Sequence, residues 1–97
     1  MIPEEYISIE RLSRLYKVSL TFFEELDDYG LVRFQTVKQL RCVHEDELKR
    51  IETIIRLHHE LEINTAGIET ILHLIKKVEN LQEEIQRIQN RLDLYED

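Results

Sequence analysis

The feature that most constrains this chain is a heptad repeat in its last third. Between Ile71 and Tyr95, apolar residues recur in alternating steps of three and four, with no Gly or Pro among them. The seam positions are Ile71, Leu74, Val78, Leu81, Ile85, Ile88, Leu92 and Tyr95. A stripe of two positions per heptad is typical of a coiled coil, because a helix that packs on a globular core has a broader apolar face. We therefore expect this helix to pair with a second copy of the chain as a homodimer. The alternative is that the seam folds back on the chain's own domain.

Length and composition indicate one small domain with a helical extension. The 97 residues carry a net charge of -7 and a single cysteine, which excludes a disulfide within the chain and a multi-cysteine metal cage. The N-terminal residues lack the basic and apolar regions of a signal peptide. No apolar run approaches the roughly 20 residues that a membrane span needs. We expect a cytoplasmic protein that does not associate with membranes.

Two short helices are predicted near the N-terminus. Ser8 is suited to cap a helix that ends near Tyr16, with Ile7 at helical spacing from the following apolar residues, and Ser19 is suited to cap a second helix over residues 20–29. Gly30 follows directly, at the position where a helix end takes a left-handed conformation. Two short helices joined by a tight turn form a helix-turn-helix.

The next segment predicts a small β-hairpin. Residues 32–43 roughly alternate between apolar and polar side chains and are rich in β-branched and aromatic types. The turn is expected near residues 37–39, although no Asn-Gly or similar pair marks its type. A hairpin that follows a helix-turn-helix is a wing. Cys42 in its second strand is expected to be a small buried apolar residue.

Two further helices complete the predicted fold. The first runs from His44 to Leu61 and presents a broad apolar face to the helix-turn-helix. The second begins after Asn64, its expected N-cap. We predict a head over residues 1–64 and a C-terminal helix over residues 65–97, whose base packs on the head through Ile68, Leu72 and Ile75. The fold class is mainly α, a winged helix-turn-helix with a coiled-coil dimerisation helix.

Three stretches carry a resemblance to a known family. They are residues 19–31, which close on Tyr29-Gly30-Leu31, residues 41–48 and residues 55–61. Together with the order of the predicted elements, they resemble the MerR family of DNA-binding regulators. The resemblance covers nearly the whole chain from about Ile7. It implies a MerR-like winged helix-turn-helix whose second helix would lie in the major groove of DNA.

A longer run resembles one branch of these proteins, the bacterial chaperone modulators of the CbpM type. The matching residues are Leu57, His59-Glu60-Leu61 and Gly67-Ile68, followed by a short heptad coil. This resemblance implies a non-enzymatic protein without a cofactor that binds the J domain of a DnaJ-like cochaperone, CbpA in that family. Binding blocks the cochaperone's stimulation of the DnaK-type chaperone. J domains carry a basic helix that contacts that chaperone, so an acidic competitor is physically reasonable.

The charge of the second helix bears on the choice between DNA and protein as partner. MerR regulators usually carry Arg-Tyr-Tyr-Glu before the closing Gly-Leu, and this chain departs from that pattern. The candidate site residues there are acidic: Glu24, Glu25, Asp27 and Asp28. Carboxylates oppose the phosphate neutralisation on which DNA affinity depends. We interpret this surface as a docking site for a basic protein, with the acidic surface of the coil as a rival location. The alternative is that these are ordinary solvated helix residues.

A DNA-binding regulator remains the second hypothesis for function. The chain through His44 has seven acidic and six basic residues, so the head is nearly neutral. The basic residues that could contact phosphates are Arg11, Arg14, Lys17, Arg33, Lys38 and Arg41. A third possibility is a scaffold in which the coil mediates assembly. The sequence offers no catalytic constellation, and the pair His58 and Glu62 lacks the further ligands that a metal site needs.

Overall fold

Serine side chains begin both helices of the helix-turn-helix in the computed structural model, which describes residues 2–95. Ser8 Oγ accepts a hydrogen bond of 3.2 Å from the Arg11 amide at the start of α1 (Ile9–Tyr16). Ser19 Oγ accepts one of 3.2 Å from the Phe22 amide at the start of α2 (Leu20–Asp28). Each cap satisfies one of the amide groups that a helix leaves without an internal partner. Both predicted caps are confirmed.

The end of α2 is a left-handed turn at Gly30, as predicted. Its φ is 68°, which a residue without a side chain adopts at no steric cost. The Leu31 amide donates to the Leu26 carbonyl at 2.9 Å, and the Gly30 amide donates to the Asp27 carbonyl at 2.9 Å. This pair of hydrogen bonds is the Schellman motif, and it returns Leu31 to the core.

The predicted wing is present as β2 (Phe34–Val37) and β3 (Leu40–His44), which pair antiparallel. Lys38 and Gln39 form the two-residue turn, with φ of 50° and 67°. Positive φ at both central positions is the type I′ geometry that matches the twist of a hairpin. Lys and Gln are not the usual residues for it, so the turn type could not be read from the sequence.

A third strand was not predicted. β1 (Tyr6–Ser8) pairs with β3, which makes a sheet of order β1-β3-β2. Ile7 was assigned to the helical pattern of the first helix, and that assignment was wrong. β1 is three residues long and too short to show an alternating pattern. Its addition makes β3 the central strand, where Cys42 is completely buried, as expected for this residue.

The helix predicted to begin at His44 begins later. His44 is the last residue of β3, and a 3₁₀ turn, η1 (Glu45–Glu47), precedes α3 (Leu48–Glu60). His44 Nδ1 accepts a hydrogen bond of 3.1 Å from the Asp46 amide, so the imidazole caps this turn. The acidic residues Glu45, Asp46 and Glu47 therefore lie in the 3₁₀ segment, which the sequence does not distinguish from a helix start.

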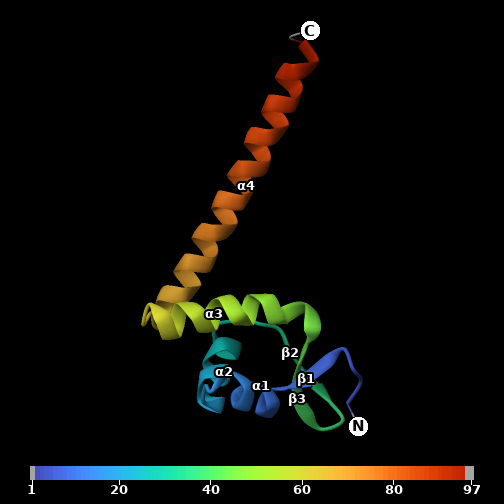
Figure 1. Ribbon diagram of the computed structural model, residues 1–97, viewed down its shortest axis with the longest axis vertical. Coiled ribbons are helices and arrows are strands. Elements are labelled where there is room, and N and C mark those ends of the chain that lie inside the picture. The colour runs from blue at the N-terminus through green and yellow to red at the C-terminus, as the bar shows by residue number, and fades with distance from the viewer. Residues whose placement is uncertain (1, 96–97) are drawn as a thin grey trace.

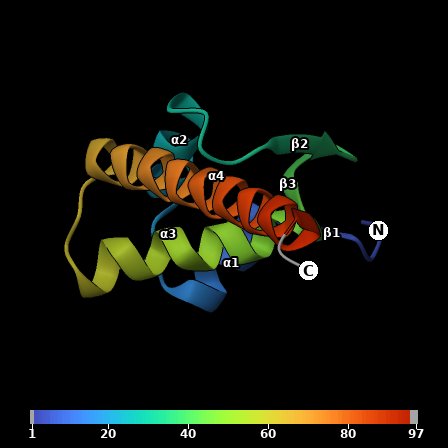
Figure 2. The ribbon, with the colours of Figure 1, turned by 90° about the horizontal axis from the view of Figure 1, so that it is seen from above.

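One hydrophobic core joins the helix-turn-helix to α3 and the sheet. α3 lies across α1 and α2 and buries Ile51, Ile54 and Ile55 against them (Figure 1). The sheet lies at one end of the head and the loop between α3 and α4 at the other (Figure 2). The buried core residues are Leu12, Val18, Phe22, Phe23, Leu26, Leu31, Val32, Val43, Ile51, Ile54, Ile55 and Ile68.

The long helix α4 (Thr65–Tyr95) starts in the head and then leaves it. Asn64 Oδ1 accepts a hydrogen bond of 2.9 Å from the Gly67 amide, which confirms Asn64 as the N-cap. Ile68 is fully buried, and Leu72 packs against the core. Ile75 was expected to do the same, but it is 42% exposed and is not among the residues packed against the core. The projecting part of α4 leaves the head (Figure 1).

Past this point the helix projects from the head, and the described chain measures 59 × 32 × 20 Å. The predicted segments 1–64 and 65–97 extend beyond the described residues at both ends. None of the helices within residues 2–95 has the length and apolar content needed to cross a bilayer.

Candidate functional site

The four acidic residues of α2 all lie on the surface, and the structure divides them into two pairs. Glu25 accepts a hydrogen bond of 2.8 Å from Thr65 Oγ1, which ties α2 to the start of α4. Asp27 forms an ion pair with Arg41 of β3. Within residues 2–95, Glu24 and Asp28 have no ion pair and no side-chain hydrogen bond. Glu24 and Asp28 are therefore the carboxylates of α2 that a partner can use.

Arg41 makes two contacts inside the head. Its guanidinium lies over the Phe34 ring, 5.6 Å from the ring centroid, and also pairs with Asp27. A cation over an aromatic face is attracted by the quadrupole of the ring. One of the six basic residues considered for phosphate contacts is thus neutralised within the chain.

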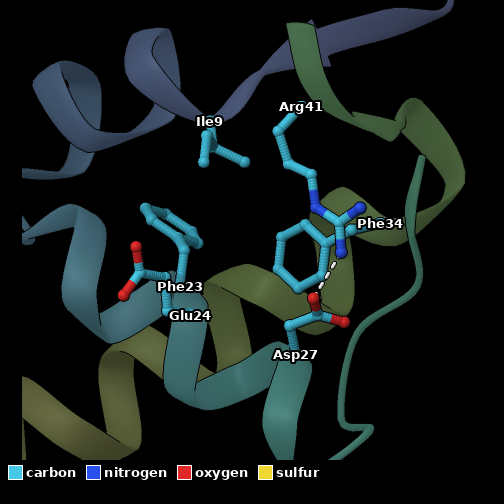
Figure 3. A pocket seen from close by; sticks show the side chains of 6 residues that line it. All are labelled: Ile9, Phe23, Glu24, Asp27, Phe34 and Arg41. Carbon is cyan, nitrogen blue, oxygen red and sulfur yellow. Dashed lines mark hydrogen bonds and ion pairs between the residues drawn. The ribbon is translucent and has the colours of Figure 1, made fainter. Parts of the chain in front are cut away.

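A hollow of about 270 Å³ lies where α1, α2 and the wing meet (Figure 3). Three of the lining residues are apolar and three are charged: Ile9, Phe23, Phe34, Glu24, Asp27 and Arg41. The rings of Phe23 and Phe34 meet edge to face at 6.5 Å and 84°. Arg41 reaches past Phe34 to Asp27 on one side of the hollow, and Glu24 lies on the other side of Phe23 (Figure 3).

Five of the six basic residues considered for phosphate contacts remain exposed and have no ion pair in the described part of the chain. They are Arg11, Arg14, Lys17, Arg33 and Lys38. Lys38 occupies the wing turn, which in a winged helix-turn-helix is placed to reach a nucleic-acid backbone. These residues leave a surface on which DNA contacts are physically possible.

Two other groups of polar side chains have structural roles. His58 stacks on Phe22 with 4.5 Å between ring centroids, and its Nδ1 lies 3.1 Å from the Ile63 carbonyl oxygen. No group of three or more metal-ligating side chains occurs within residues 2–95. The Tyr16 hydroxyl donates a hydrogen bond of 2.8 Å to Glu52. Partial burial, together with this hydrogen bond and the charge of Glu52, raises the pKa of Tyr16.

The heptad seam of α4 is open to solvent along the projecting part of the helix. The six positions from Leu74 to Leu92 are each 51–58% exposed, and Tyr95 is 87% exposed. Ile71 is half-buried beside the head. A soluble helix seldom exposes a continuous apolar stripe of this length without a partner. The seam is therefore an apolar stripe that stays uncovered on the described chain.

The sequence patterns did not predict the hollow or the two contacts that side chains of α2 make with α4 and β3. Ile9, Phe34 and Arg41 come from three different elements, so no spacing along the chain joins them. Glu25 and Thr65 are 40 residues apart. The one available signal was compositional, because Arg41 and Asp27 are opposite charges, one on the predicted wing and the other on the second predicted helix.

Comparison with known proteins agrees with this architecture. No curated protein and no solved structure gives a significant match to the sequence. A family described as MerR HTH family regulatory protein matches residues 7–90, which span β1, the helix-turn-helix, the wing, α3 and most of α4. The match covers the helix-turn-helix and the wing together with the helix that carries the seam, so the chain belongs to the MerR helix-turn-helix family of regulatory proteins.

Proposed function

We propose that this chain is a non-enzymatic chaperone modulator of the CbpM type. It binds the J domain of a DnaJ-like, CbpA-type cochaperone in the cytoplasm and inhibits the cochaperone's stimulation of the DnaK-type chaperone. Residues 1–64 form the head that carries the docking surface, and residues 65–97 form the helix that pairs two copies.

The observation that carries this proposal is which α2 carboxylates have an ion pair within the described chain and which do not. Glu24 and Asp28 are exposed one helical turn apart, and neither has an ion pair within residues 2–95. The nearest wing cation, Arg41, is already paired with Asp27. A duplex approaching α2 would meet uncompensated negative charge, whereas a basic helix would gain complementary charge.

The exposed seam supports a homodimer. Pairing two copies of α4 would cover the apolar positions from Leu74 to Leu92, which are otherwise half-exposed. A dimer would present two α2 surfaces, so one modulator could hold two cochaperone subunits and gain avidity if that cochaperone is itself dimeric.

Charge reversal tests which acidic surface docks the J domain. The double variant Glu24→Lys, Asp28→Lys should weaken binding to a purified J domain by at least about tenfold, because two attractions become repulsions. The matched control is Glu79→Lys, Glu83→Lys, which reverses two exposed charges at the same spacing on α4. Isothermal titration calorimetry measures both affinities. A larger loss in the control would move the docking site to the coil.

A MerR-like DNA-binding transcriptional regulator is the second candidate. The family match and the exposed Lys38 at the wing turn favour it. Titration with duplex DNA at two salt concentrations distinguishes the candidates, because phosphate contacts release counterions and make affinity fall steeply with salt. DNA binding with a steep salt slope, together with no J-domain binding, would reject the modulator function.

A further inference from the structure

The hollow between α1, α2 and the wing has the chemistry to hold one positively charged side chain. Of the two carboxylates that line it, Asp27 is paired with the guanidinium of Arg41, and Glu24 has no ion pair within residues 2–95. One negative charge is thus left without compensation at a site walled by Ile9 and the Phe34 ring. The stem of a lysine or arginine buries well on apolar walls while its charged head stays at a polar rim.

Arg41 already makes this kind of contact within the chain. Its guanidinium uses the Phe34 ring and the Asp27 carboxylate at the same time. Glu24, on the other side of Phe23, offers a second carboxylate to a second cation (Figure 3). Arg41 therefore occupies the part of the hollow beside Phe34 and Asp27, and the part beside Glu24 remains available.

We infer that this hollow is the anchor point of the docking surface, where it receives a lysine or arginine side chain from a basic helix of the partner protein. The stem lies against Ile9 and Phe23, and the charge lies beside Glu24. This inference rests on the proposed function for the identity of the partner, but the chemistry of the hollow can be tested without it.

The first experiment uses a probe that does not depend on the partner. N-acetyl-arginine amide is titrated into the full ¹⁵N-labelled chain and followed by NMR, with N-acetyl-alanine amide as the control compound. Saturable shifts concentrated at Ile9, Phe23 and Glu24 are expected for the arginine compound alone. Absent shifts, or shifts spread evenly over the acidic surface including α4, would overturn the inference.

The second experiment compares three single variants in binding to the J domain. Glu24→Gln keeps the shape of the side chain and should weaken binding by about fivefold, the upper range for one exposed ion pair. Asp28→Asn removes an equal charge one turn away and outside the hollow, so its effect should be about twofold or less. Equal losses of J-domain affinity in these two variants would indicate only a general effect of negative charge. They would contradict the inference that the hollow anchors the partner's side chain.

The third variant, Arg41→Gln, should bind more tightly. It frees Asp27 and uncovers the Phe34 ring for the incoming side chain, so affinity for both the arginine probe and the J domain should rise severalfold. A residue that only held the wing in place would weaken binding when lost. Unchanged or weaker binding of the arginine probe to this variant would contradict the inference.

The two experiments separate this inference from the proposed function. Saturable binding of the arginine probe without J-domain binding would reject the CbpM-type function and leave the hollow as a cation anchor for another basic partner. If Glu24→Gln and Asp28→Asn weaken J-domain binding equally, the proposed function stands. The inference that the hollow anchors the partner's side chain is then rejected.

Discussion

At the scale of single residues, four residues with local roles set boundaries of the helices α1, α2 and α4. Ser8 and Ser19 accept hydrogen bonds from free amides at the helix starts, and Asn64 does the same for α4. Gly30 supplies the left-handed turn that ends α2. A lost cap costs about 0.5–2 kcal/mol, which is large beside the few kcal/mol of a small domain.

The Tyr16–Glu52 hydrogen bond makes stability depend on pH. The pKa of Tyr16 is raised above 10.0 in the folded chain, so the unfolded chain loses this proton first as the pH rises. The stabilisation that the protonated Tyr16 hydroxyl gives the fold is fully present below the ordinary pKa of tyrosine. It is lost as the pH rises through the pKa of Tyr16 in the folded chain. Tyr16→Phe should therefore destabilise the protein at neutral pH, by at most about 1 kcal/mol because the hydrogen bond is exposed.

The measurement is urea unfolding of Tyr16→Phe and wild type at about pH 7 and above about pH 10. The difference in unfolding free energy should shrink at the higher pH, where tyrosinate and the Glu52 carboxylate repel each other. A difference that stays constant over this range would contradict the role given to the hydroxyl.

At the scale of elements, α4 combines two kinds of helix. Its first turns pack on the head as a helix of a globular domain does, with Ile68 buried and Leu72 packed on the core. From Leu74 onward the seam is half-exposed, and the helix projects away from the head (Figure 1). The seam and the head can therefore be perturbed separately.

A charge in the middle of the seam should separate the proposed dimer without unfolding the head. Ile85→Lys places an ammonium group at a position that the dimer would bury, and an unpaired buried charge is strongly unfavourable. Sedimentation equilibrium should show monomers for this variant and dimers for wild type, and the circular dichroism of the head should persist. The control Glu83→Lys changes an exposed residue off the seam and should remain dimeric.

At the scale of the whole molecule, the head is small, and 12 buried apolar residues within residues 2–95 form its core cluster. Domains of about 60 residues bury a modest fraction of their surface and are marginally stable alone. Ile68 belongs to both the core and α4, so pairing of the coils would be coupled to the stability of the head.

That coupling predicts a melting temperature that depends on concentration. Raising the protein from about 2 to about 200 μM should raise the Tm by a few degrees, because the native dimer is favoured by mass action. Differential scanning calorimetry at both concentrations measures it. In Ile85→Lys the dependence should vanish, and a wild-type Tm that does not move with concentration would argue against the dimer.

Much of the fold could be predicted because it depends on neighbours along the chain. Caps, the Gly30 turn and the hairpin are decided within a few residues, and a heptad seam is a regular repeat. The same kind of argument identified the four α2 carboxylates, because their positions follow from counting back from the closing glycine. Local patterns gave the wrong structure at Ile7 and His44, because both residues belong to paired strands and not to the predicted helices.

The candidate site depends on contacts that no local pattern encodes. Spacing alone could not distinguish Glu24 and Asp28 from Asp27 and Glu25, since all four are acidic and exposed on one helix. The fold brings Arg41 to Asp27 from β3 and Thr65 to Glu25 from α4, and it closes Ile9 and Phe34 around the hollow. The sequence alone thus establishes the helices, the wing and the seam from short-range patterns. Only the packing of distant segments establishes which charges are neutralised and which remain for a partner.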